Sequence, residues 1–131
     1  MSGISLFVGA DCAIQIQVKD QNGNPINLSN NVTGVTGIII FLRDTNRNVF
    51  ARFSSNAASG YGTIDNSSGA SGILNFYCTR DKTQNIKTGD LLMELAVIRT
   101  DPNFPNGRKD VITDAVIGTI YPSITNTVTI P

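Results

Sequence analysis

The residues of this 131-residue chain that could do chemistry are few and widely spaced. The sequence has no histidine, and its single glutamate is Glu94. Acid–base catalysis would therefore need carboxylates, lysines or tyrosines, and these do not cluster along the chain. A glycosidase would also need an aspartate brought to Glu94 from elsewhere, because glycoside hydrolysis uses two carboxyl groups. We predict that the protein is not an enzyme and has no catalytic residue.

Metal ligands are equally sparse. Asp101, Asp110 and Asp114 flank one loop and could offer oxygen atoms to calcium, but their spacing is not that of an EF-hand. The two cysteines, without histidine, cannot complete the four ligands of a structural zinc site. We expect no metal ion and no other cofactor.

The two cysteines are better explained by the strands that carry them. Apolar residues alternate from Cys12 to Val18 and again from Gly72 to Thr79, the period of half-buried strands. If the two strands pair in antiparallel fashion, one register places their apolar residues on one face, and a slip by one residue would expose them. That register pairs Cys12 with Cys78, Ile14 with Phe76, Ile16 with Leu74 and Val18 with Gly72.

We therefore predict that Cys12 and Cys78 are a neighbouring pair in the core. They could form a disulfide or remain two reduced thiols that pack as small apolar residues. The reduced form is the better interpretation, because directly opposed strand positions often fit disulfide geometry poorly and nothing indicates an oxidising compartment.

The rest of the chain also has the pattern of strands and turns. Further strands are predicted at 35–43, 49–54, 90–100 and 111–121, with a polar loop at 54–71 that holds one short strand. The segment from Ile124 to Ile130 alternates again. We predict one domain over residues 1–131, an all-β fold of the immunoglobulin-like type, in which about seven to nine strands form an antiparallel β-sandwich.

Charge and hydropathy exclude two classes of partner. The ten basic and ten acidic residues give zero net charge, so no basic stripe is expected to bind nucleic acid. The longest aliphatic or aromatic run, Ile38 to Leu42, is far shorter than the ~20 residues that span a bilayer. The first residues lack the features of a secretory signal. We expect neither nucleic-acid nor membrane binding.

Three of the predicted strands carry apolar residues on both faces. In an immunoglobulin-type order, the strands at 35–43, 90–100 and 111–121 are neighbours, so their outer residues form an apolar patch that a soluble monomer rarely exposes. We predict that a partner covers it, although a bulge that reverses the alternation, or the C-terminal segment folding over this face, would explain the pattern equally well. The predicted interface residues are Ile39, Phe41, Leu92, Ala96, Ile98, Ile112, Val116 and Ile120.

Several motifs together resemble a known family. The chain reads DQNGNPINL at 20–28, GIIIFLRD at 37–44 and SGILNFYCTRDKTQNIKTGDLLMELAV at 71–97. This order is similar to the immunoglobulin-like N-terminal domains of phage baseplate upper proteins and to related small phage tail proteins. The resemblance implies a structural module of a virion, assembled in the host cytoplasm, that binds other virion proteins and has no catalytic residues.

Self-association into a homo-oligomer is also expected, and pairing of the segment from Ile124 to Ile130 with the sheet edge of a neighbour is one route to it. A different class of function, a carbohydrate-binding module, is the alternative, because this is a common role of small β-sandwiches. Tyr61 and Tyr121 would be its candidate sugar-binding residues, although they are weak as a platform.

Overall fold

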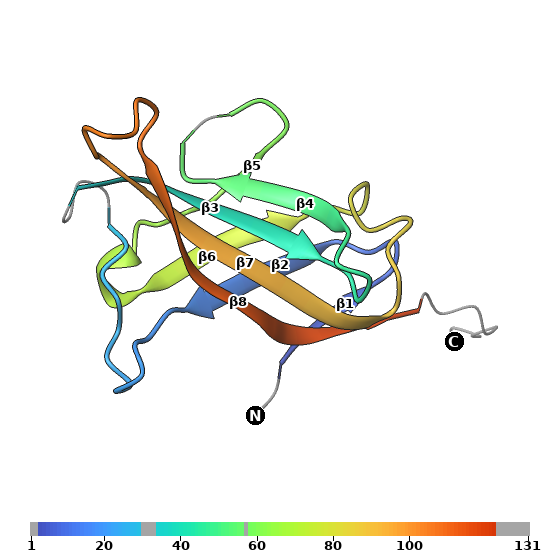
Figure 1. Ribbon diagram of the computed structural model, residues 1–131. Helices are drawn as coiled ribbons and strands as arrows, with labels where there is room; N and C mark the ends of the chain where they lie inside the picture. Colours follow the sequence, from blue (N-terminus) through green and yellow to red (C-terminus); the bar gives the residue numbers. More distant parts are fainter. Residues whose placement is uncertain (1–2, 30–33, 57, 123–131) are drawn as a thin grey trace, which may run out of the picture.

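The computed structural model describes residues 3–29, 34–56 and 58–122, which form an all-β fold of two sheets (Figure 1). The large sheet has six strands in the order β1-β8-β7-β3-β4-β5, and β2 pairs with β6 in a second sheet. In these residues no helix is long and apolar enough to cross a membrane. The elements are β1 (Ile4–Phe7), β2 (Cys12–Gln17), β3 (Val35–Arg43), β4 (Val49–Ser54), β5 (Gly62–Thr63), the short 3-10 helix η1 (Gly69–Ser71), β6 (Ile73–Cys78), β7 (Gly89–Arg99) and β8 (Arg108–Tyr121).

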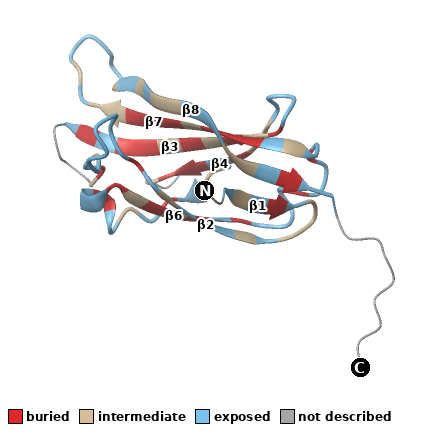
Figure 2. Ribbon diagram, turned by 90° about the horizontal axis from the view of Figure 1, so that it is seen from below, coloured by how far each residue is buried: buried red, intermediate tan, exposed pale blue. Residues whose placement is uncertain are grey.

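The large sheet is mixed and curled, which corrects the expectation of a purely antiparallel sandwich. β1 pairs with β8 in parallel, and β4 pairs with β5 in parallel, whereas β3, β7 and β8 are antiparallel neighbours as predicted. Figure 2 shows the end of β8 bending toward β1, beneath the rest of the large sheet. The large sheet thus has the form of a half-barrel around the β2–β6 pair.

The predicted register of the small sheet is confirmed. Cys12 lies opposite Cys78, Ile14 opposite Phe76 and Ile16 opposite Leu74. Beyond the paired strands, the amide of Val18 donates to the carbonyl oxygen of Gly72 at 2.8 Å, so the pairing continues to the predicted fourth position. The hydrophobic pattern is sufficient to predict this register because a slip would move every apolar residue to the solvent face.

The core lies between the two sheets. Buried side chains of β3 and β7 alternate with residues of the outer face, and Figure 2 shows these strands as the most buried part of the sheet. The ring of Phe53 on β4 packs against that of Phe76 on β6, with 4.7 Å between centroids, so aromatic contact joins the two sheets directly. Residues with an exposed fraction of 0% include Ile38, Ile40, Leu74, Phe76, Leu95 and Val97.

Two aspartates organise the turns that follow β2 and β3. The carboxylate of Asp20 accepts hydrogen bonds from the amides of Asn22 and Asn24, at 2.9 and 3.0 Å. The Asp44 carboxylate accepts from the amides of Asn46 and Asn48 in the same pattern, at 3.0 and 3.1 Å. Asparagine- and glycine-rich turns of this kind are stabilised by a local side-chain acceptor. These two turns are therefore structured connections.

β1 can lie beside β8 only because residue 118 is a glycine. Ile4 is paired with Gly118, and a Cβ atom at residue 118 would lie 2.8 Å from the Ile4 backbone nitrogen and overlap the Ile4 carbonyl oxygen. These are backbone atoms of a paired strand, so a larger residue would push β1 away. The contact matters to the core because Leu6 on β1 is fully buried.

We predict that Gly118→Ala lowers the free energy of unfolding by about 1–3 kcal/mol, the usual range for overpacking a tight contact. Denaturant unfolding measures the loss, and amide hydrogen exchange of Ile4–Phe7 should accelerate most. Thr119→Ala, at an exposed neighbouring position, is the control and should be nearly neutral. Equal stability of Gly118→Ala and the parent chain would show that β1 does not depend on this approach.

Candidate functional site

The outer face of β3, β7 and β8 is the first candidate site, because six of the eight predicted interface residues lie on it. Cross-strand pairing places Ile39 beside Ala96, and Leu92 beside Val116. The neighbouring charged residues Arg43 and Glu94 belong to the same face, as their ion pair shows. The six residues are Ile39, Phe41, Leu92, Ala96, Ile98 and Val116.

The outward orientation predicted for Ile112 and Ile120 is wrong. The pairing of β8 with β7 shifts twice, leaving Ile112 and Ile117 as extra residues in β8. Each such bulge reverses the alternation of side chains along the strand. Ile120 is therefore in the core with 1% of its surface exposed, and Ile112 packs against the core cluster. Val111 takes the outward position opposite Ala96.

Charged side chains cover the centre of the outer face. Arg43, Arg52 and Lys109 lie over the ring of Phe41, with their cationic groups 5.9, 6.0 and 5.0 Å from its centroid. Each position is within reach of a cation–π interaction. Phe41 is consequently half-buried within its own chain. The exposed apolar patch is smaller than predicted. Alternation shows which side of the sheet a residue faces, but not how long side chains of neighbouring residues fold over it.

Glu94 links this charged group together. Its carboxylate accepts from Arg43 Nη1 at 3.2 Å and from Lys109 Nζ at 3.1 Å. Burial acts to raise the pKa of Glu94, but the hydrogen bonds and charges of Lys109 and Arg43 outweigh it, and the pKa lies below its ordinary value of 4.5. The structure also brings Asp114 opposite Glu94, a carboxylate pair that sequence spacing did not reveal. Glu94 with a lowered pKa is unsuited to the general acid role that a glycosidase pair requires.

What remains exposed on this face is concentrated on β8. Val111 and Val116 have 56% and 57% of their surfaces exposed. They lie on either side of Asp114, which is within 4.0 Å of Arg47. β8 therefore presents a small apolar surface flanked by charged groups.

The second candidate site is a groove that the sequence did not predict. It has a volume of about 980 Å³ and runs between β8 and the end of β2. It exists because β1 pairs only with Gly118–Tyr121, so that in the described part of the chain residues 108–117 of β8 pair with β7 alone. No strand was predicted at Ile4–Phe7, so the unpaired length of β8 was not expected from the sequence.

The cysteine pair is structural in character. Both cysteines are free thiols; Cys78 is buried, whereas Cys12 is only partly buried and packs at the margin of the core. Burial raises the pKa of Cys78 to about 12, with a smaller contribution from nearby Cys12, and burial also raises the pKa of Cys12. Both therefore remain protonated near neutral pH, and a protonated thiol is a poor nucleophile.

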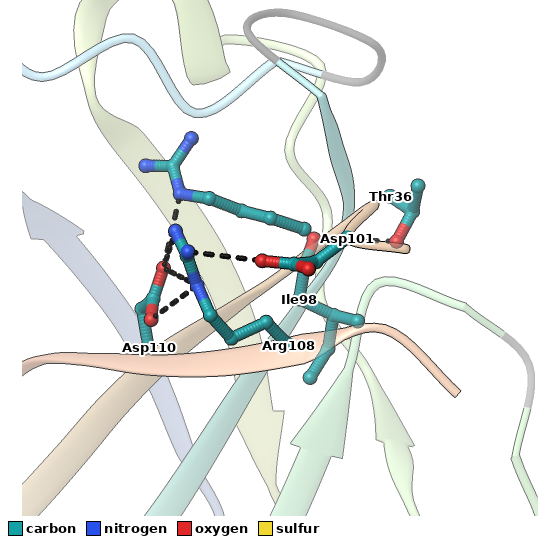
Figure 3. A network of polar contacts seen from close by, with 6 residues as sticks. Thr36, Ile98, Asp101, Arg108 and Asp110 are labelled. Atoms are coloured by element: carbon teal, nitrogen blue, oxygen red, sulfur yellow. Dashed lines mark hydrogen bonds and ion pairs between the residues drawn. The ribbon is translucent and has the colours of Figure 1, made fainter. Parts of the chain in front are cut away.

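The loop between β7 and β8 and the start of β8 carry an ion-pair network (Figure 3). Arg108 donates to Asp101 at 3.1 Å through Nη1 and to Asp110 at 3.0 Å through Nη2. Arg99 approaches Asp110 from β7, at 3.4 Å. Arginine side chains thus occupy the carboxylates that were considered as calcium ligands. Across the described residues, no group of three or more histidine, cysteine or acidic residues is arranged to hold a metal ion.

In comparisons with known proteins, the chain matches no family model and no curated protein. The interpretation of both candidate sites therefore depends on their geometry.

The bulge at Ile117 gives a direct prediction. Ile120→Ala should lower the free energy of unfolding by about 2–4 kcal/mol, because it removes buried core volume. Val116→Ala, on the other side of the bulge and exposed, should change it by less than about 0.5 kcal/mol. Denaturant unfolding of the two variants measures the difference. Similar losses in both would contradict the reversal of side-chain direction.

Glu94 gives a prediction about pH. Glu94→Gln should destabilise the protein by about 1–2 kcal/mol at neutral pH, because two cations lose their charged acceptor. A carboxylate whose folded pKa is lowered stabilises the fold above its unfolded pKa, and this contribution disappears as the pH falls through the folded value. The difference between parent and variant should therefore shrink below the ordinary pKa of 4.5. Unfolding curves over a pH series measure it.

Asp90→Asn, at an exposed position on the same strand, is the matched control for Glu94→Gln. At neutral pH, Asp90→Asn should lower the free energy of unfolding by less than Glu94→Gln does. A stability difference for Glu94→Gln that persists at about pH 3 would contradict the ionic explanation.

Proposed function

We propose that this protein is a non-enzymatic structural component of a bacteriophage particle, of the tail, baseplate or head-decoration type. In this proposal it is assembled into the virion in the host cytoplasm and acts by binding other virion proteins and copies of itself. The observation that carries the proposal is β8, which combines exposed Val111 and Val116 with an edge that is unpaired within the described residues at 108–117. An open edge with exposed apolar residues is a surface suited to association.

The turn after β2 supports the family resemblance. In the segment DQNGNPINL, Asp20 accepts the turn amides and Gly23 has a φ of 83°, in the left-handed region that favours glycine. The amide of Ile26 then donates to the carbonyl oxygen of Val18 at 2.9 Å, and Leu28 enters the core with 1% exposure. The residues that define the motif therefore reverse the chain and anchor its return.

The strand pairing supports the immunoglobulin-like part of the proposal. β2 pairs with β6, and β3, β7 and β8 are neighbours in the other sheet, as expected for that type of domain. The parallel pairs and the curl of the large sheet distinguish this chain from a flat sandwich of two antiparallel sheets. We therefore propose a modified immunoglobulin-like domain.

Carbohydrate binding is less well supported. Tyr121 lies on β8 next to β1, where its ring stacks on Phe7 with 5.2 Å between centroids. Tyr61 precedes β5, at the opposite end of the sheet order, and contacts Phe41. The two tyrosines therefore do not form one sugar-binding platform. Glycan binding that is lost in Tyr61→Ala or Tyr121→Ala would instead favour this alternative.

The assembly proposal predicts the effect of charge on β8. Val111→Asp combined with Val116→Asp should reduce association of the chain with itself or with virion proteins by at least about tenfold, because burying a carboxylate at an apolar contact is unfavourable. Light scattering and sedimentation velocity over a concentration series measure self-association. Tyr77→Asp, on β6 and 67% exposed, is the control and should have little effect.

The location in a virion needs its own test. Antibodies raised against the chain should label particles purified from a lysate of the host that carries the gene, when these are viewed by electron microscopy. A chain that stays monomeric at high concentration and is missing from purified particles by mass spectrometry would contradict the proposal.

A further inference from the structure

The groove beside β8 is bordered by two strand edges that have no partner among the described residues. On one side, residues 108–117 of β8 pair only with β7. On the other side, β2 pairs only with β6 and is followed by a single bridge between Lys19 and Pro25. Both strands contribute to the groove lining. The free edges of the two sheets therefore border one groove. The groove lies beside β8, in the position that β1 occupies farther along the same strand.

The groove lining combines apolar and polar residues. Its lining includes Ile16 from β2 and Met93 from β7, together with the two bulged residues of β8, Ile112 and Ile117. Its charged residues are Lys19, Asp20 and Asp90. An uncharged strand with one apolar face fits this lining, because its backbone can pair with an open edge while alternate side chains enter the groove.

The regular part of the open edge is short. The bulges at Ile112 and Ile117 limit regular register with β7 along this edge to two runs of four residues, Arg108–Val111 and Thr113–Val116, and the second run borders the groove. Bulges make a sheet edge a poor template for indiscriminate pairing. Stable occupancy therefore needs side-chain contacts in the groove as well as backbone hydrogen bonds, which favours one particular strand over others.

Residues 124–130 of the chain, which lie outside the described residues, have the required sequence. Six of the seven residues in ITNTVTI are β-branched, and none is charged. In an extended conformation, Ile124, Val128 and Ile130 share one face with Asn126, and three threonines form the other. In an extended conformation the segment would be about 23 Å long. Pro122 and Pro131 flank it in the sequence, and because proline is disfavoured within a central strand, a paired strand would be confined to the residues between them.

The same copy cannot place this whole segment along the open edge of its own β8. The lining of the groove continues to Gly118 and Thr119, but the open edge ends at Ile117, which is about 13 Å from Tyr121 along the strand. Ile124 follows Tyr121 by three residues and can reach at most about 11 Å from it. β1 already occupies the intervening edge beside Gly118–Tyr121. A second copy has no such limit.

We propose that residues Ile124–Ile130 of one copy pair with the open edge of β8 in a second copy and place their isoleucine and valine side chains in its groove. This inference rests on the proposed assembly function and names one of its contacts. The contact joins two different surfaces, so it propagates from copy to copy and forms either a closed ring or a filament.

The full chain with Val128→Pro tests the segment, because proline removes a backbone donor and is poorly tolerated inside a paired strand. We expect self-association to weaken by at least about tenfold. Thr127→Ala, on the opposite face of the segment, is the control and should change it by less than about threefold. Sedimentation velocity over a concentration series gives the association constants, and denaturant unfolding shows whether each variant is folded.

The groove is tested by Thr113→Lys, which places a charge at the edge between the two bulges, a device by which natural proteins block strand pairing. It should also prevent self-association. A mixture of the Val128→Pro and Thr113→Lys chains restores one intact segment and one intact groove, so it should form a heterodimer that does not grow further. Should Thr113→Lys not fold, Gln17→Lys, at an exposed position of the groove lining, replaces it.

Two results would overturn the inference. If Val128→Pro associates as strongly as the parent while Val111→Asp, a change outside the groove lining, does not, assembly uses the outer face and only the proposed function stands. If Val128→Pro lowers the stability of a chain that is monomeric at every concentration, the segment packs within its own copy. In that case both the inference and the proposal of self-association are wrong.

Discussion

The bulge at Ile117 is the constraint on which both candidate surfaces depend. β8 has fourteen residues and must serve two purposes along its length. Near its end it closes the core with Ile120 and supports β1, whereas farther back it presents Val116 to the outside. One extra residue reverses the side-chain direction between these two parts. Without that reversal, Ile120 would point into solvent and the core beneath β1 would be unfilled.

The same strand explains why the domain is closed at one end and open at the other. Gly118 lets β1 approach closely, and β1 covers only Gly118–Tyr121. Beyond that point β8 pairs with β7 alone among the described residues, and the groove opens toward β2. The aromatic contact between Phe53 and Phe76 holds the two sheets together at another point in the core. The groove is therefore bordered by elements that the core keeps in place.

The outer face shows how charge and apolar surface are balanced in a neutral protein. Three cationic side chains cover Phe41, and Glu94 joins two of them. This arrangement shields the centre of the face from water and leaves the apolar exposure on β8. An ion pair at a partly exposed site adds little stability by itself, but several charges around one ring restrict where a partner can bind. The position of the exposed valines beside an open edge favours contacts along β8.

The sequence by itself determined the all-β class, the strands other than β1 near their observed positions, and the register of β2 with β6. That register follows from period-two alternation, because a slip by one residue would move the apolar residues to the solvent face. It also placed Ile39, Phe41 and Leu92 on the outer face. Only the tertiary structure decided the directions of Ile112 and Ile120, because a bulge arises from pairing with β7 and leaves the local sequence pattern unchanged. The covering of Phe41, the pairing of Glu94 with Asp114 and the groove were also beyond the sequence. Each depends on residues distant in the chain that meet only when the sheets curl around one core.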